Sequence, residues 1–489
     1  MKKMKKYIIA ILSIFLMTMG CTDEDYANLN EDPINPSEVP AGFLFANATK
    51  TIFDQMGSTS VNRNVFRLFA QYWTECQYTT ETNYQIDNRS LPDTHWGIFY
   101  RDVLFDLKNA IELVENQEIT TDFTPAVQAN QLAIIRIVEV YAWQQLVDTF
   151  GNIPYTEALM GSENTTPAYD DAQTIYDDLI SKINWAYENL DSSAVGFEDQ
   201  DIVYHDNIES WKKLASTIKF KIGMRLADQN PSLSQTLVTE AVSQGIFSSS
   251  SDSFSLQYEN NNTNANPLYA DLYLSGRQDF VPANTFVDNL NELEDPRRSV
   301  FFDSNLVDDD GNVYYEGGIY GSLNNYSLFT HIGSYFYAPD IPVILMDYSE
   351  IEFLLAEAVE RGYSVGGSAE EHYNNAIRAN MEFWEIEEAA IDSYLTQSNV
   401  AYSTAPGTWK EKIGMQFWIA MYNRGFEGWT VWRRYEAPTL NLPAESNADI
   451  PVRFTYPAEE QTLNATNWSA AASAIGGDNL YTKLFWDVN

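Results

Sequence analysis

Apolar residues recur at three- and four-residue steps along most of the chain from about residue 41 onward. The stretches 96–114, 132–150, 175–190 and 211–226 each place their apolar residues on one face of a helix. Gly151 and Pro231 follow two of these stretches, as helix-ending residues do. Further helices are predicted near 348–361, 369–386, 408–422 and 425–436. Helix pairs in succession favour a tetratricopeptide-like solenoid, although the strict repeat signature is absent.

The helical periodicity is lost between about residues 245 and 342. This segment contains Ser248–Ser251, Asn260–Asn262 and many Tyr and Gly residues, and Asp309-Asp310-Gly311 predicts a hairpin turn. A loop-rich segment of roughly a hundred residues is too long to be a mere connection. We therefore expect functional residues there.

The first twenty residues have the pattern of a secretory signal peptide. Lysines at positions 2, 3, 5 and 6 precede a weakly polar or apolar run, Tyr7–Met19, which is too short to span the ~30 Å core of a bilayer. Cys21 directly follows Gly20, as in the bacterial signal for lipid attachment, although Thr18 stands where Leu is usual. We predict a signal peptide at 1–20 and a lipidated tether at 21–40, anchored to a membrane without spanning it. The alternative is a plain signal peptide that leaves Cys21 as a free thiol.

The net charge limits the ligand class. The chain of 489 residues has 69 acidic and 29 basic side chains, a formal charge of −40. Removal of residues 1–20, which hold four lysines and no acid, makes it −44. Such a surface repels phosphate backbones, so nucleic-acid binding is excluded, and among glycans a neutral one is favoured over a sulfated or uronate-rich one.

The sequence lacks the common catalytic and metal-binding motifs, among them HExxH, GxSxG, GxxxxGK[ST] and GxGxxG. The four histidines lie far apart, and we expect them to be surface or capping residues. Cys76, the only cysteine after Cys21, is expected to be a small buried hydrophobe. Residues 308–312 resemble a calcium loop, but Leu306 and Gly317 occupy its first and twelfth ligand positions, which favours an acidic turn. We therefore expect no cofactor, with calcium as the open alternative, and no pair of carboxylates stands out as a glycosidase acid and base.

Aromatic and amide residues in the non-periodic segments suggest sugar binding. A sugar ring offers C–H groups on one face and hydroxyls around its rim; flat aromatic side chains cover that face, and polar side chains reach the rim. Trp96 is ambiguous, because it follows a polar loop but also opens an apolar helical stripe. The candidate ligand-binding residues are Tyr78, Asn83, Tyr84, Trp96, Tyr273, Arg277, Tyr320, Tyr335 and Tyr337.

Five segments, in the same order along the chain, resemble the SusD/RagB family of Bacteroidetes surface lipoproteins. Any one of them alone would be a weak match. They are the acidic residues after Cys21 with the run Asn30–Pro36, the segment Leu146–Ala158, the segment Phe353–Ala358, the segment Gly425–Trp429 with Trp432-Arg433-Arg434, and Tyr456–Glu460 with Asn464.

This resemblance implies a mainly α-helical fold of tetratricopeptide-like helix pairs packed against a loop-rich region with a few short strands. It implies one domain at 41–489, with a helical scaffold at about 41–244 and 343–489 and a ligand-binding excursion at about 245–342. It also implies a lipid-anchored protein on the extracellular face of the outer membrane. There it would capture a neutral glycan, such as a β-glucan, and deliver it to a SusC-like TonB-dependent transporter without catalysis.

The resemblance does not carry the binding residues, because they vary between family members. Three alternatives stay open: a lid that captures peptides or other nutrients, a glycoside hydrolase, and a purely structural interaction protein.

Overall fold

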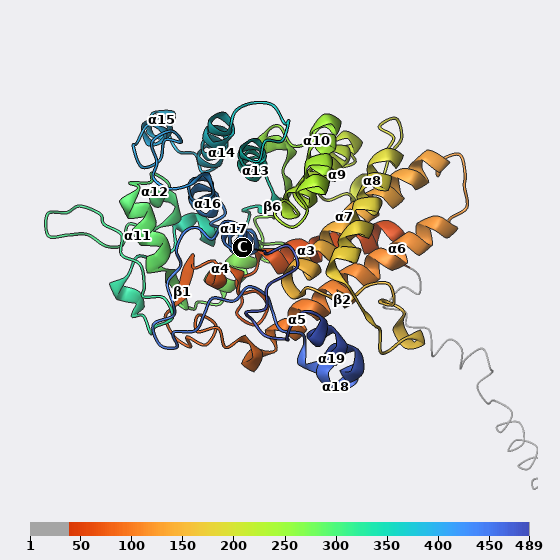
Figure 1. Cartoon of the computed structure of the whole chain (residues 1–489), viewed down its shortest axis with the longest axis horizontal. Helices are drawn as coiled ribbons and strands as arrows, with labels where there is room; N and C mark the ends of the chain where they lie inside the picture. The colour runs from red at the N-terminus through yellow and green to blue at the C-terminus, as the bar shows by residue number, and fades with distance from the viewer. Residues whose placement is uncertain (1–38, 489) are drawn as a thin grey trace, which may run out of the picture.

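The computed structural model describes residues 39–488 and is dominated by helices, with a few short strands (Figure 1). This confirms the predicted fold class. The signal peptide and Cys21 lie outside the described residues. The main helices of the first part of the chain are α3 (Ala41–Gly57), α4 (Phe66–Phe69), α5 (Leu91–Gly97), α6 (Phe105–Asn116), α7 (Pro125–Phe150), α8 (Ala172–Asn189), α9 (Ile208–Arg225) and α10 (Pro231–Gln244). Those of the second part are α11 (Asn284–Glu292), α12 (Arg298–Phe301), α13 (Tyr348–Glu360), α14 (Ala369–Phe383), α15 (Glu388–Leu395), α16 (Trp409–Ala420), α17 (Gly425–Tyr435), α18 (Ala458–Leu463) and α19 (Ala465–Ala474).

The helices pack mainly as sequential pairs. The pairs are α7 with α8, α9 with α10, α13 with α14, and α16 with α17, and Figure 1 shows several of them side by side across the top and right of the molecule. Several helices begin where a polar side chain accepts a hydrogen bond from a first-turn N–H group, as Thr124 does for α7 and Asn207 for α9. Thr408 and Glu411 form a reciprocal capping box at the start of α16.

The strands form three short antiparallel pairs that tie distant segments together. β1 (Trp73–Glu75) pairs with β5 (Phe280–Pro282), β2 (Ile153–Pro154) with β3 (Tyr169–Asp170), and β4 (Phe254–Leu256) with β6 (Val343–Met346). In the first and third pairs, β5 and β4 lie within the non-periodic segment, and each pairs with a strand outside it. The π-helical turn η6 (Tyr269–Leu274) lies just before β5.

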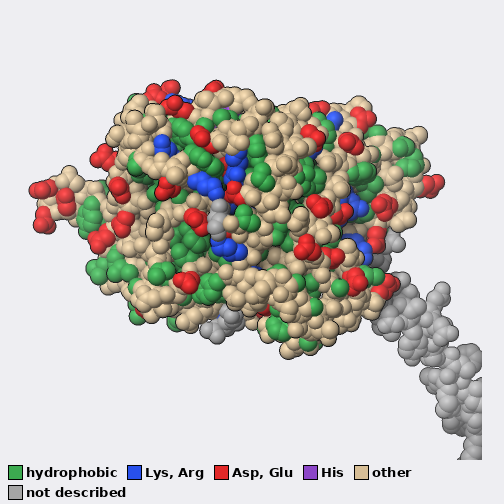
Figure 2. All heavy atoms as spheres, viewed as in Figure 1, with side chains coloured by type: hydrophobic (Ala, Val, Ile, Leu, Met, Phe, Trp, Pro, Cys, Tyr) green, Lys and Arg blue, Asp and Glu red, His purple; other side chains and the backbone are tan. Residues whose placement is uncertain are grey.

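The predicted turn at Asp309-Asp310-Gly311 is confirmed as a hairpin. Val307 and Val313 bridge across it, and the Asp308 carboxylate accepts hydrogen bonds from the backbone of Asp310 (2.9 Å) and Asn312 (2.8 Å). The acidic group thus closes its own turn. The green loop after α12 projects at the left of Figure 1, and the projection in Figure 2 is acidic at its tip. Among residues 39–488, no three His, Cys, Asp or Glu side chains gather in a way that could hold a metal ion.

The family-like segments supply buried charged groups that join the helix pairs. Glu357 of α13 accepts hydrogen bonds from Arg434 (2.8 and 2.9 Å) and Arg361 (2.8 Å), and Glu427 of α17 accepts from Lys221 of α9 (2.8 Å). Asp148 of α7 accepts from Tyr176 and Trp486 at 2.5 and 2.8 Å. Replacing one of these residues by an uncharged one would leave its buried partner without compensation, which is costly.

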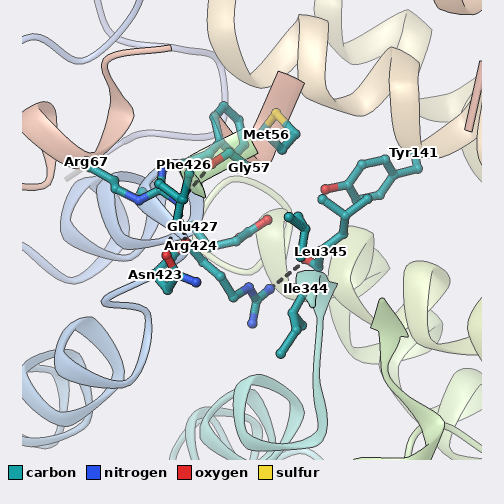
Figure 3. Close-up of a pocket in the computed structure, with 13 residues that line it drawn as sticks. Met56, Gly57, Arg67, Tyr141, Ile344, Leu345, Asn423, Arg424, Phe426 and Glu427 are labelled. Atoms are coloured by element: carbon teal, nitrogen blue, oxygen red, sulfur yellow. Dashed lines mark hydrogen bonds between the residues drawn. The ribbon is translucent and has the colours of Figure 1, made fainter. Parts of the chain in front are cut away.

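A cavity of about 20 Å³ lies beside the start of α17, between Met56, Tyr141 and Arg424 (Figure 3). Arg424 donates a hydrogen bond to the backbone oxygen of Leu345 at 2.7 Å. The space suits about one water molecule and is too small for a sugar ring. It is therefore a feature of the scaffold.

Two sequence expectations about single residues have opposite outcomes. Cys76 is buried, as predicted, and burial raises the pKa of its thiol to about 12. His95 was expected at the surface or at a cap, which is wrong, because its ring is fully buried against Phe66 and Phe99. Its place on the apolar face of α5 explains the difference.

None of the helices within residues 39–488 combines the length and apolarity that a bilayer crossing needs.

Candidate functional site

The pairing of β1 with β5 brings two of the polar candidate segments together. The backbone N–H of Cys76, just after β1, donates to the backbone oxygen of Asp279, just before β5, at 2.7 Å. A pocket of about 210 Å³ opens beside this junction, and Tyr78 and Arg277 both line it. Its remaining wall is Thr59, Ser60, Val61, Asn62, Glu75, Gln77, Arg89, Ala270, Asp271, Ser275, Asp279 and Phe280. We call this the β1–β5 pocket.

Asp271 of η6 fixes one wall of the β1–β5 pocket. Its carboxylate accepts hydrogen bonds from the Ser58 hydroxyl (2.9 Å) and from the backbone N–H groups of Thr59 (2.8 Å) and Ser60 (3.0 Å). Three donors on one carboxylate hold the loop after α3 against η6. All three donors reach the same oxygen, Oδ2, so Asp271 shapes this wall of the pocket.

A buried pair of carboxyl groups supports another part of the lining. Glu75 and Glu81 are 2% and 0% exposed. Glu75 accepts from the backbone N–H (3.0 Å) and hydroxyl (2.8 Å) of Thr82, and Glu81 pairs with the guanidinium of Arg89. Burial, with the neighbouring Glu81, raises the pKa of Glu75 to about 9, so Glu75 is a neutral acid near pH 7. Arg89 is thereby held at the pocket wall.

The mouth of the β1–β5 pocket carries exposed aromatic and cationic side chains. Tyr78 is 64% exposed and has a positive φ of 58°, so the turn after β1 directs it away from the core. The candidate Tyr273 is 58% exposed and stacks on Tyr269 with ring centroids 5.0 Å apart, but neither ring is among the residues that line the pocket. Arg277 pairs with Asp279 at 2.5 Å and is also largely exposed. These groups offer a flat apolar face and hydrogen-bond donors together.

Three of the candidate residues are buried in the core. Tyr84 and Tyr320 are 4% and 1% exposed, and their rings contact each other at 6.1 Å. The Tyr320 hydroxyl donates to the backbone oxygen of Leu68 (2.7 Å), and burial raises the pKa of Tyr84 to about 12. Asn83 is 6% exposed and donates to the backbone of Thr79 (2.7 Å) and Gly321 (3.0 Å). In this conformation these groups hold loops together and present no ring face to a ligand.

The other candidates lie apart from the lining of the β1–β5 pocket. Trp96 is half-buried and packs on Tyr100 (4.7 Å) and Phe150 (5.0 Å), in agreement with its apolar helical stripe. Tyr335 packs edge-on against Trp384 at 5.3 Å. Tyr337 is also half-buried, and burial, with the neighbouring Tyr326, raises its pKa.

The sequence-based candidates do not include Asp271, which fixes one wall of the pocket. Asp271 acts through contacts with a loop distant in sequence, at Ser58, Thr59 and Ser60, and no local pattern signals it.

Comparison with known proteins identifies the family. Residues 33–457 match the sequence profile of the SusD-like family, described as "Starch-binding associating with outer membrane". The chain belongs to the SusD-like family. This match covers most of the chain and includes both sides of the β1–β5 pocket.

Solved structures of SusD-like proteins superpose on nearly the whole chain. A chitin-binding protein has 26% sequence identity and a TM-score of 0.79, and the match covers 92% of this chain and 100% of that one. A SusD homologue from Bacteroides fragilis (22%, TM-score 0.77) covers 92% and 99%, and a chitin-binding SusD homologue from Flavobacterium johnsoniae (23%, TM-score 0.75) covers 91% and 99%. Comparison with curated proteins gives no match. The SusD-like fold is therefore shared at low sequence identity.

Proposed function

We propose that this SusD-like protein binds a neutral oligo- or polysaccharide at the cell surface and delivers it to a SusC-like TonB-dependent transporter. The observation that carries the proposal is the β1–β5 pocket, where Tyr78 and Arg277 meet although about two hundred residues separate them in sequence. An aromatic face beside fixed polar groups is the surface that a sugar ring requires.

Charge supports a neutral ligand. The wall of the β1–β5 pocket contains three carboxyl groups (Glu75, Asp271 and Asp279) and two guanidinium groups (Arg89 and Arg277), and each guanidinium is already paired with a carboxylate. A sulfated or uronate chain would have to break these pairs and approach a molecule of charge −40. A neutral chain pays neither electrostatic cost.

The relatives add one ligand class to test. The chitin-binding protein at 26% identity suggests that neutral polymers of N-acetylglucosamine belong beside β-glucans and α-glucans among the candidates. The proposed ligand is therefore a neutral glycan of one of these classes.

The carboxyl groups of the β1–β5 pocket are arranged for structure, and this supports a binding role without catalysis. Asp271 anchors three donors, Asp279 pairs with Arg277, and Glu75 is buried against Glu81. A glycosidase requires an acid and a base on opposite sides of the scissile bond. Release of reducing sugar by the purified protein would contradict this part of the proposal.

We further propose that residues 1–20 are removed, that a lipid on Cys21 anchors the chain through a tether at 21–40, and that 41–489 form one domain. A lipid-anchored protein holds its ligand site near its transporter. Replacement of Cys21 by Ser should release the protein from the outer membrane, as measured by fractionation. Recovery of a SusC-like barrel with the wild-type protein after detergent extraction tests the partner.

The ligand is tested by calorimetric titration of the mature protein with soluble neutral oligosaccharides: laminarihexaose, cellohexaose, maltoheptaose and chitohexaose. We expect heat with at least one of them and none with a uronate or sulfated oligosaccharide of similar length. Binding of di- to oligopeptides without any response to the sugars would instead support the peptide-capturing alternative.

A further inference from the structure

A trough runs along α6, α7 and α8 and shares no lining residue with the β1–β5 pocket. It consists of two adjoining hollows of about 380 and 440 Å³, and Glu115, Arg136 and Lys182 line both of them. Leu132 and Trp143 of α7 lie toward its two ends, eleven residues apart on the helix, or about 16 Å. The trough is therefore long enough for a short oligomer.

The cations of the trough already have partners. Arg136 pairs with Glu139 at 2.7 Å. Lys182 lies 3.2 Å from Glu139 and donates to the Tyr155 hydroxyl at 2.7 Å, and Lys108 donates to the backbone oxygen of Leu159 at 2.8 Å. An anionic ligand would have to displace these partners. A hydroxyl-rich neutral ligand can instead add donors and acceptors around pairs that stay intact.

Trp185 provides an aromatic surface at one end of the trough. It is 41% exposed on α8, although a large apolar side chain on a solvent-facing helix is usually covered. Leu132 extends the apolar floor, and Ser181, Lys182 and Arg136 surround it with polar groups. An exposed indole ring within a polar rim matches the two faces of a sugar ring.

We propose that this trough is a second carbohydrate-binding site, in which a sugar ring of a neutral oligosaccharide stacks on Trp185 and its hydroxyls reach the Arg136–Glu139–Lys182 group. The site goes beyond the glycan capture proposed for the β1–β5 pocket and does not require it. With two sites on different elements, one long glycan can contact the protein at both, which raises its apparent affinity through effective concentration.

The test uses calorimetric titration with the same four oligosaccharides in a Tyr78→Ala/Arg277→Ala background, in which the β1–β5 pocket is disabled. We expect residual binding of at least one of them. Addition of Trp185→Ala should weaken it about tenfold or more, whereas Trp185→Phe, which keeps a flat ring, should retain most of it. Leu113→Ala, an equally exposed apolar residue of α6 outside the trough lining, is the matched control and should change nothing.

Unfolding temperatures of all variants establish that the fold is intact, and Trp185→Phe keeps the test valid if Trp185→Ala unfolds. The proposal is overturned if the double-substituted background binds none of the oligosaccharides, or if its binding is unaffected by both Trp185 substitutions. Trp185-dependent binding of peptides in place of the sugars would also overturn it. If Tyr78→Ala/Arg277→Ala leaves the affinity at the wild-type value while the Trp185 substitutions lower it, glycan binding at the β1–β5 pocket is refuted and this second site stands.

Discussion

At the scale of single residues, the Glu75–Glu81 pair makes folding sensitive to pH. Glu75 is almost completely buried, and burial with the neighbouring Glu81 raises its pKa from 4.5 to about 9. Between these two values the folded protein holds a proton that the unfolded chain releases. Rising pH therefore favours the unfolded chain, by at most about 1.4 kcal/mol per pH unit.

We predict that Glu75→Gln removes this pH dependence, because a neutral amide replaces the neutral acid and can still accept from Thr82. The free energy of unfolding of the variant minus that of the wild type should increase as pH rises from about 4.5 to 9, as measured by chemical denaturation. Glu118→Gln, at an exposed position, controls for the loss of one negative charge. A difference that stays constant over this range would contradict the buried-acid interpretation.

For His95 we predict the opposite pH dependence: the fold loses stability as the pH falls. Burial lowers its pKa from 6.5 to about 3, so the unfolded chain takes up a proton that the folded protein refuses. The stability associated with neutral His95 is present above pH 6.5 and is lost as pH falls toward 3. His95→Leu should lose less stability than the wild type over this window, in thermal unfolding at a series of pH values. His205→Asn, at the surface, is the control, and parallel curves for wild type and His95→Leu would refute the assignment.

At the scale of elements, the joints between helix pairs depend on buried ion pairs. Glu357 on α13 receives Arg434 from α17, Arg361 from its own helix end, and the Tyr435 hydroxyl. Its side chain is 2% exposed, so the loss of its charge leaves two guanidinium groups with less compensation. Glu357 is therefore one of the buried carboxylates that join α13 to α17.

We predict that Glu357→Gln destabilises the fold by about 3–5 kcal/mol, measured as the free energy of unfolding in urea. Asp392→Asn removes a carboxylate of similar geometry, since Asp392 pairs with Arg378 at 2.5 Å, but there the side chains are 61% and 33% exposed. Asp392→Asn should lower the free energy of unfolding by at most about 1 kcal/mol. If the two substitutions lower the free energy of unfolding equally, the buried ion pair stabilises the fold no more than the exposed one.

The sequence predicted these elements well where one local rule decides the structure. Helices 408–422 and 425–436 appear as α16 and α17, because periodic apolar residues and capping signals act within a few turns. The sequence also predicted the hairpin of the acidic turn. It did not predict that His95 is buried, because a single histidine on the apolar face of a helix cannot be told from a capping histidine by the sequence pattern alone.

At the scale of the whole molecule, the site could be predicted only in part. The polar loops that carry Tyr78 and Arg277 were recognised from composition, but what joins them is the β1–β5 pairing across two hundred residues of chain. The same composition also selected Tyr84 and Tyr320, which face the core. Whether a loop aromatic is exposed depends on tertiary packing, which no spacing rule within one segment encodes.

The charge of the molecule acts at this scale too. Asp and Glu are spread over much of the face seen in Figure 2, whereas Lys and Arg gather in a few places. This distribution keeps the surface negative while the cations at the sites remain paired. It favours a neutral ligand at both the β1–β5 pocket and the trough.

The central claim, glycan capture at the β1–β5 pocket, is tested most directly by titrating the best-binding neutral oligosaccharide into the wild type and two variants. Tyr78→Ala removes an exposed ring and Arg277→Ala an exposed guanidinium group of the pocket lining, and each should weaken binding about tenfold, with unchanged unfolding temperatures. Phe43→Ala, an exposed aromatic on α3 outside the pocket lining, should bind as the wild type does. If the Tyr78 and Arg277 variants keep wild-type affinity, the pocket is not the glycan site.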